Sequence, residues 1–140
     1  MKRYLSVLVA SLFVLSSGIA LAEFNGSDDE QCTYVGNITK IENSPRAIVI
    51  KTAFEKTAKE RKLILQDECQ VQIQTTKNPA DRGAFRKFSD LKGGELVVVH
   101  GWTKDGKWLA RSIRIQNPDD YLMKRLADDA KAGVYYNHEP

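Results

Sequence analysis

The sequence predicts a mainly β domain of five strands, with a short helix between the third and fourth strands and a second helix at the C-terminus. Runs rich in Val, Ile and Thr recur between residues 32 and 116 and are separated by turn-forming residues. Residues 117–133 instead space their apolar side chains as an amphipathic helix does. The chain has 140 residues, which suits one small domain with one core.

The N-terminal segment predicts export. Lys2 and Arg3 precede an uncharged, largely apolar run that ends in Ala20-Leu21-Ala22, the small-x-small pattern that signal peptidases cleave. The run is short for a membrane span and is interrupted at residues 16–18, so a cleaved signal peptide over 1–22 is favoured over a retained anchor. We therefore expect a periplasmic or secreted protein with no membrane span after cleavage.

Charge is distributed in blocks. Residues 23–31 are acidic and predict a disordered lead-in. Residues 32–116 carry 16 basic and 9 acidic residues, whereas residues 117–140 are acidic overall. Such blocks affect solubility and partners rather than the fold.

The first two strands are expected over residues 32–41 and 47–54, joined by a turn over 42–45. Val35, Ile38 and Ile41 lie three apart in the first strand, which a regular two-residue period does not allow. We expect a bulge at Gly36-Asn37 to restore a common face.

The third strand is expected over residues 61–75, with a bend where Asp67-Glu68-Cys69 divides two apolar runs. In residues 77–92 that follow, Phe85, Phe88 and Leu91 recur at helical spacing. This predicts a short helix or turn that plugs the core.

The last two strands, 96–102 and 108–116, are joined by an Asp105-Gly106 turn, a strong hairpin signal. Asn117 then predicts the N-cap of the terminal helix within residues 117–140. The apolar stripe of this helix is Leu122, Met123, Leu126, Ala127 and Ala130.

The order of elements and several motifs resemble the OB-fold, a five-stranded Greek-key barrel, and more narrowly small exported bacterial OB-fold proteins. The matching motifs are Gly36-Asn37-Ile38, then residues 88–101 (FSDLKGGELVVVHG), then Asp105-Gly106-Lys107-Trp108 and Ala110-Arg111-Ser112-Ile113. The resemblance covers about residues 35–115 and implies an OB-like barrel over 32–116. Some relatives of this kind are linked to envelope stress tolerance.

The two cysteines, Cys32 and Cys69, both lie after the signal peptide. Thiols of exported proteins usually pair in an oxidising compartment, so the sequence predicts a Cys32–Cys69 disulfide. No C-x-x-C occurs that would indicate redox chemistry.

No catalytic motif is apparent, and we expect a protein that is not an enzyme and needs no cofactor. The two histidines, His100 and His138, have no further His or Cys at ligand spacing, so no metal site is expected. His138 is interpreted as part of an exposed tail. A nuclease built on Asp81, Arg82 and Arg86 is the less favoured enzymatic alternative.

A two-residue turn fixes the register of the final hairpin and predicts two faces. The expected core face holds Leu96, Val98, Trp102, Leu109, Ile113 and Ile115; the outer face holds Val97, Val99, Gly101, Trp108, Ala110, Ser112 and Arg114. Trp108 is then expected to pack under the terminal helix or to contact a partner. His100 and Arg111 would face the core, which requires an acidic partner, a polar barrel end or, preferably, a bulge that turns Arg111 outward.

The function favoured by these observations is a binding or interaction module of the bacterial envelope, acting on an envelope protein or polymer. A secreted binder of single-stranded nucleic acid or another anionic polymer is the alternative. Candidate contact residues are Trp108, Lys107, Arg114, Lys104, Lys51 and Arg61.

Overall fold

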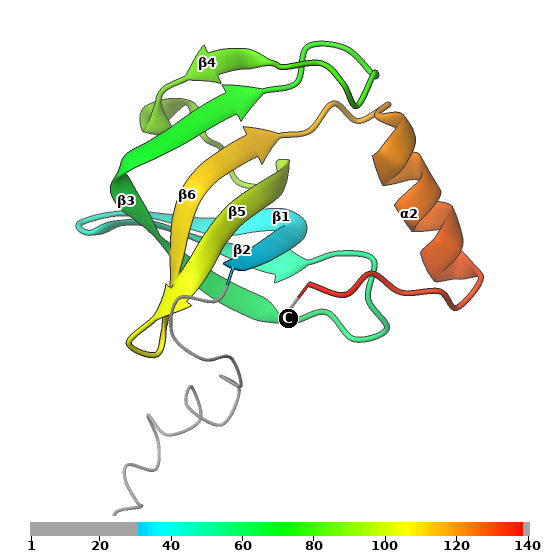
Figure 1. The fold of residues 1–140 in the computed structure, drawn as a ribbon, viewed down its shortest axis with the longest axis horizontal. Coiled ribbons are helices and arrows are strands. Elements are labelled where there is room, and N and C mark those ends of the chain that lie inside the picture. Colours follow the sequence, from blue (N-terminus) through cyan, green and yellow to red (C-terminus); the bar gives the residue numbers. More distant parts are fainter. Residues whose placement is uncertain (1–30, 139–140) are drawn as a thin grey trace, which may run out of the picture.

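A computed structural model describes residues 31–138 of the protein. Its elements are β1 (Gln31–Asn43), β2 (Arg46–Thr52), β3 (Glu60–Ile73), β4 (Ala84–Arg86), the 3-10 helix η1 (Phe88–Asp90), β5 (Leu96–Lys104), β6 (Lys107–Ile115) and α2 (Tyr121–Lys131) (Figure 1). The predicted signal peptide and nearly all of the predicted acidic lead-in lie outside the described residues.

Five of the strands close into a barrel. In the sheet order β2-β1-β5-β6-β3-β4, an additional β2–β3 pairing joins the two sides and leaves β4 as a short extension beside β3. All pairings are antiparallel except that of β3 with β6. The connection from β3 to the parallel β6 through β5 is the Greek-key course of an OB-type barrel, so the predicted fold class is confirmed.

The irregularity of β1 lies later than predicted. The register with β2 shifts between Ile38 and Lys40, so the extra residue is Thr39 and not Gly36-Asn37. Ile38 faces the core in regular alternation with Cys32 and Tyr34, and Val35 faces the outside of the barrel. The extra residue after Ile38 lets Ile41 pack against the core as well. Gly36 has a different role: an added Cβ would lie 2.4 Å from the carbonyl oxygen of Lys51, so the close approach of β2 requires glycine.

The bend predicted in β3 is confirmed. Its register with β6 shifts between Leu65 and Gln70, which brackets the Asp67-Glu68-Cys69 segment. Strands with such a bulge bend sharply, and the bend lets one long strand pair with β2 at one end and with β4 at the other.

The β3–β5 connection contains a short strand and a single 3-10 turn. Leu91 enters the core and Phe88 packs against it as predicted, but Phe85 is 69% exposed because β4 turns it outward. Asp81 organises the loop before β4 by accepting hydrogen bonds from the backbone N–H of Thr75, Thr76 and Gly83 and from the Thr75 hydroxyl. These bonds hold the pKa of the Asp81 carboxyl well below its usual range.

The β5–β6 hairpin has the predicted turn, since Lys104 pairs with Lys107 and Trp102 with Leu109. Beyond Ala110 the register shifts, and His100 pairs with Ser112. Arg111 is therefore the extra residue of a bulge and is exposed, which confirms the favoured explanation for its placement.

The predicted faces of this hairpin are wrong for β5 and for the part of β6 before the bulge, where Ala110 and Trp108 face the core and Leu109 does not. Val97 and Val99 are fully buried in the core, whereas Leu96, Val98 and Trp102 lie on the other side of the strand. Ile113 and Ile115 face the core as expected, and Ala110 joins them, because the bulge adds one residue between the two halves of β6.

Helix α2 begins later than predicted. Its N-cap is Asp120, whose side chain accepts a hydrogen bond of 2.9 Å from the backbone N–H of Met123. Asn117 instead closes the preceding turn by accepting from the Asp119 N–H. Of the predicted stripe, Met123 is buried, Leu126 is partly buried and Leu122 is 50% exposed. Within residues 31–138, no helix is both long and apolar enough to cross a membrane.

Candidate functional site

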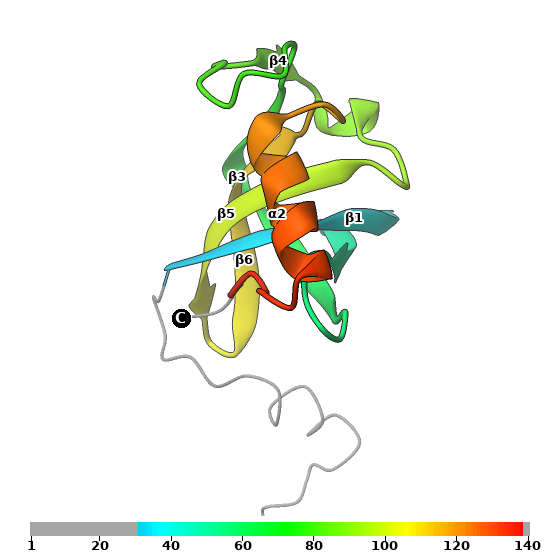
Figure 2. The same ribbon diagram turned by 90° about the vertical axis from the view of Figure 1, so that its right-hand side faces the viewer.

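A cleft of about 500 Å³ lies between α2 and the outer wall of the barrel. Figure 2 shows α2 crossing in front of the barrel strands, with the C-terminal tail returning beneath it. The residues that line the cleft come from both the barrel and the C-terminal segment: Val35, Pro79, Val98, His100, Arg114, Gln116, Asp120, Leu122, Met123, Arg125, Leu126, Asp129 and Tyr136. The barrel supplies one wall of the cleft, and the C-terminal segment supplies the other.

The N-terminal end of α2 is fixed by a buried polar network around Gln74, which is 3% exposed. The Gln74 side-chain amide donates to the Asp120 carboxylate and to the Asn78 carbonyl. Its oxygen accepts from the Gln116 side chain at 3.1 Å. Because Asp120 also caps the helix, the start of α2 is held directly against the end of β3.

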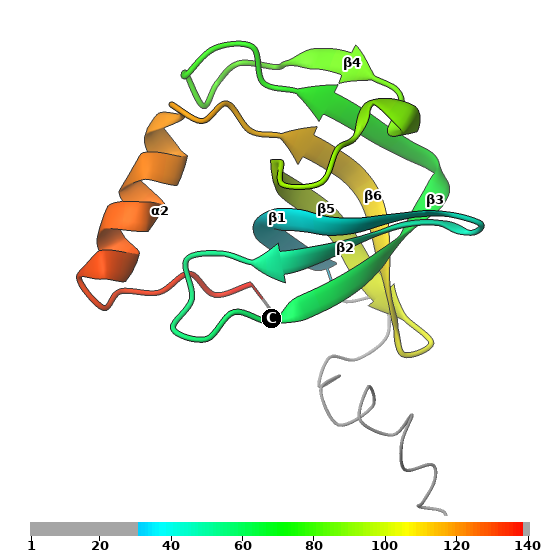
Figure 3. The same cartoon turned by 180° about the vertical axis from the view of Figure 1, so that it is seen from behind.

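The far end of the C-terminal segment is also fixed to the barrel. The Tyr136 N–H donates to the Phe54 carbonyl at 3.0 Å. The His138 ring places Nε2 at 2.9 Å from the Val35 carbonyl oxygen and Nδ1 at 3.1 Å from Glu55 Oε1. Figure 3 shows the tail running from α2 back to the ends of the barrel strands.

The interpretation of His138 as an exposed tail residue is therefore wrong. Its side chain is 1% exposed and contacts the rings of Tyr34 and Tyr136. The sequence held no local signal for this, because the partners of His138 lie about 80 to 100 residues earlier in the chain.

Arg114 is the main polar group of the cleft. It lies opposite Val98 on the outer side of β6, and its Nε and Nη2 atoms are buried. Within residues 31–138, neither atom has a hydrogen-bond partner. The side-chain oxygen of Gln116, two residues further along the strand, is likewise buried without one.

His100 lies beside this guanidinium. Burial lowers the pKa of His100, and the positive charge of Arg114 lowers it further. Its Nδ1 lies 3.2 Å from the Thr33 hydroxyl. His100 therefore stays neutral to more acidic pH than an ordinary histidine does, and it provides hydrogen-bonding capacity rather than charge.

The remaining lining is mostly apolar. Val35 is buried on the outer side of β1, apart from the barrel core. Val98 faces the cleft from β5, while Met123 and Leu126 face it from α2 and Tyr136 from the tail. The cleft thus combines an apolar wall on each side with a cation that makes no ion pair within residues 31–138.

The two tryptophans do face opposite ways, but in the reverse of the predicted sense. Trp108 packs against the core, with the Arg61 guanidinium 5.0 Å from its ring centroid. Trp102 lies outside, with Arg111 at 5.3 Å. The expectation that Trp108 packs under the terminal helix is wrong, because α2 covers the outer side of β1, β5 and β6 near Val98.

The other predicted contact residues are not gathered at the cleft. Lys104 and Lys107 are exposed beside the hairpin turn, and Lys51 is exposed on β2. Arg61 is 3% exposed, where its contact with Trp108 indicates a structural role. Of the predicted set, Arg114 alone lines the cleft.

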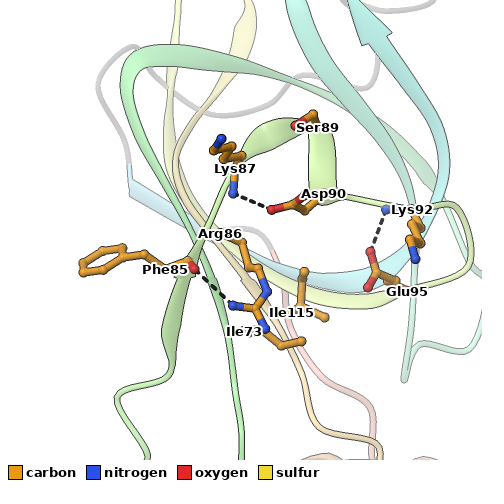
Figure 4. Close-up of a pocket in the computed structure, with 9 residues that line it drawn as sticks. All are labelled: Ile73, Phe85, Arg86, Lys87, Ser89, Asp90, Lys92, Glu95 and Ile115. Carbon is orange, nitrogen blue, oxygen red and sulfur yellow. Dashed lines mark hydrogen bonds between the residues drawn. The ribbon is translucent and has the colours of Figure 1, made fainter.

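A second, more open cleft of about 780 Å³ lies beside β4 and η1. Figure 4 shows Phe85 pointing away from the group, while Lys87 N–H and Asp90 are joined by a hydrogen bond. Its lining consists of Ile73, Phe85, Arg86, Lys87, Ser89, Asp90, Lys92, Glu95 and Ile115. This surface is basic, with two carboxylates among the cations.

The predicted Cys32–Cys69 disulfide is not present in the structure. Cys32 lies on β1 opposite Gly101, whereas Cys69 lies at the bend of β3. In the sheet, β5 and β6 separate β1 from β3 on one side and β2 separates them on the other, so the two thiols belong to strands that do not pair. Burial raises the pKa of the Cys69 thiol to about 11.

Within residues 31–138, no cluster of three or more His, Cys, Asp or Glu side chains could hold a metal ion. Asp81, the acidic residue of the nuclease alternative, accepts four hydrogen bonds within its own loop.

No protein-family model and no curated protein matches the chain. Among solved structures, it is similar to silver-bound CusF from Escherichia coli (residues 10–88), with a TM-score of 0.45 and 12% identity over 65% of this chain and 98% of that chain. Apo-CusF from the same organism (residues 6–88) gives a TM-score of 0.45 and 12% identity over 68% of this chain and 98% of that chain. At this identity the likeness concerns only the course of the chain and transfers no ligand.

Proposed function

We propose that the protein is an exported, non-enzymatic binding module of the bacterial envelope, and that it holds a small ligand in the cleft between α2 and the barrel. One observation carries the proposal: the C-terminal segment is fixed to the barrel at both of its ends, and a cleft of about 500 Å³ stays open between this segment and the barrel wall. Ligand sites are typically such preformed, mostly apolar clefts with a few polar groups.

The test uses an uncharged apolar probe, N-phenyl-1-naphthylamine, whose fluorescence rises in apolar surroundings. The wild-type protein should enhance its emission in a saturable manner. Val98→Trp should abolish the enhancement, because the larger side chain fills the cleft from the barrel wall. Val134→Trp, at a position 61% exposed in the tail, is the matched control and should bind like wild type. Equal binding by both variants would overturn the proposed site.

Export is tested separately on the full chain. Expressed in a bacterium, the protein should appear in the osmotic-shock fraction, with the mass of a chain that begins at Glu23. A cytoplasmic protein of full-length mass would overturn this part of the proposal.

The second candidate function is binding of an anionic polymer such as single-stranded nucleic acid, and the open cleft of Figure 4 favours it. Phe85 is exposed at the edge of this cleft, and Arg86, Lys87 and Lys92 line it; exposed rings and cations on one surface can support base stacking and phosphate contacts. Oligonucleotide binding that weakens with salt and is lost in Phe85→Ala would support it; binding that is unchanged in this variant would exclude the surface.

A further inference from the structure

The Arg114 side chain is partly exposed, but two of its three guanidinium nitrogens are buried. Nε and Nη2 are both buried, and within the described residues neither donates a hydrogen bond. Leaving a buried polar group unsatisfied is costly, and more so for a charged group than for a neutral one. Arginine is also always charged, so it does not escape this cost by losing a proton.

The acids near the cleft do not meet this requirement. Both Asp120 oxygens are engaged, one by the Met123 N–H and the other by Gln74. Asp129 lines the cleft, but no ion pair links it to Arg114 in the described part of the chain. An anion in the cleft would supply a counter-charge to the guanidinium, approaching Nη1, the one nitrogen outside the buried pair.

The surroundings of Arg114 define the rest of such a ligand. Val35 and Val98 form the barrel wall, and Met123 and Leu126 form the helix wall, so an apolar body would be buried on two sides. Arg125 adds a second cation from α2. A guanidinium matches a carboxylate well because its N–H groups form paired hydrogen bonds with the two oxygens.

We propose that the cleft binds a small amphiphilic carboxylate, with the carboxylate on Arg114 and the apolar body between α2 and the barrel. This inference rests on the proposed function and specifies its ligand class. It involves no covalent step. The anion also cancels the charge that lowers the pKa of His100, so binding should raise the pKa of that histidine.

The experiment compares three probes by calorimetry and by NMR of the full chain: decanoate, decanol and acetate. Decanoate should bind at least about tenfold more tightly than decanol, because a hydrogen-bonded charge pair is added to the same apolar contact. Acetate should bind weakly, since it lacks the apolar body. Decanoate, but not decanol, should raise the pKa of His100 in an NMR titration.

Arg114→Met keeps an apolar stem and removes the charge, so it should bind decanoate no better than decanol. Arg111→Met is the matched control, because Arg111 lies three residues away on the same strand but outside the cleft, against Trp102. It should bind decanoate like wild type. Equal affinity for decanoate and decanol, or an unchanged Arg114→Met, would overturn the carboxylate assignment while leaving the cleft as an apolar site. If neither decanoate nor decanol shifts the NMR signals of cleft residues, both this inference and the proposed site fail.

Discussion

Replacement of His138 by alanine should release the C-terminal tail from the barrel. The buried ring contacts the Val35 carbonyl at 2.9 Å and the Glu55 carboxylate at 3.1 Å. It also meets the Tyr136 ring edge-on, with centroids 4.6 Å apart. Alanine removes all three contacts, after which the Val35 carbonyl keeps only the Ala53 N–H and the Glu55 carboxylate keeps the Thr52 hydroxyl.

The size of the effect follows from these contacts. The Nε2 contact with the Val35 carbonyl contributes about 1 kcal/mol as a neutral hydrogen bond. The Nδ1 approach to Glu55 lacks hydrogen-bond geometry, so it counts only within the burial of the ring, which adds roughly 1 kcal/mol. The aromatic contact adds about 0.5–1.5 kcal/mol. Release of the tail returns about 1–2 kcal/mol of conformational entropy per freed residue, so the net loss is smaller than the sum. We expect a loss of about 2 kcal/mol, which lowers the Tm of a domain of this size by roughly 8 °C.

Two measurements check this prediction. Thermal unfolding followed by circular dichroism should show the lower Tm, and hydrogen exchange should show faster exchange of the Tyr136 N–H, which donates to Phe54 in the intact tail. Tyr135→Ala is the control, since that side chain is 46% exposed. If His138→Ala matches Tyr135→Ala in both measurements, the reasoning that His138 fixes the tail is refuted.

Three further predictions concern the barrel itself. Gly101→Ala should lower the Tm severely or prevent folding, because a Cβ would lie 1.8 Å from the Leu109 carbonyl oxygen. Gly93→Ala is the control and should melt like wild type, because a Cβ there would lie in open space. Similar melting curves for the two variants would contradict the register of β5 with β6. Cys69 should react with iodoacetamide at pH 8 about a hundredfold more slowly in the folded protein than in urea, because burial raises its pKa from 9.0 to about 11 and so reduces the thiolate fraction; equal rates would show that the thiol is accessible and unperturbed. The pKa of Asp81 is lowered in the folded state, so its stabilising contribution is present above about pH 4 and is lost as the pH falls below that. Asp81→Asn should therefore flatten the acid decline of Tm between about pH 4 and pH 2, and parallel curves for the two proteins would argue against that role.

Local signals account for what the sequence predicted correctly. The Asp105-Gly106 turn fixed the pairs nearest to it, and the interrupted apolar runs around residues 67–69 located the bend of β3. The order of strands followed from alternation and turn residues, which depend only on neighbours in the chain.

The faces of the last hairpin depend on a bulge that alternation cannot locate. Before the bulge at Arg111, Ala110 faces the core; after it, Ile113 does, an odd spacing that a regular strand does not allow. Applying one period to both halves therefore reversed β5 and placed Trp102 in the core. Only the packing of both strands against the rest of the barrel decides where the extra residue lies.

The predictions for the C-terminal tail and for the cysteines were wrong for a different reason. The prediction of a disulfide depended on the compartment and on the number of thiols, neither of which specifies distance. His138 likewise has contacts with Val35 and Glu55 that no local pattern encodes. In both cases the closure of the barrel decides which distant segments meet: it brings His138 to Val35 and Glu55, and it keeps Cys32 and Cys69 on strands that do not pair.

The bulge at Arg111 also decides which β6 side chain reaches the cleft, since it lets Ile113 and Ile115 face the core while Arg114 lines the cleft beside α2. Arg114 lies outside the barrel core, and within the described residues two of its guanidinium nitrogens are buried without a partner, which costs stability. Arg114→Met should therefore raise the Tm of the ligand-free protein, by roughly 4 °C for about 1 kcal/mol of relieved desolvation. Arg111→Met, which removes an exposed cation, should leave the Tm almost unchanged. Decanoate should then narrow the difference in Tm between wild type and Arg114→Met, because it stabilises wild type and not the variant. A lower Tm for Arg114→Met without ligand would mean that the protein itself already satisfies the guanidinium, and the case for an external carboxylate would fall with it.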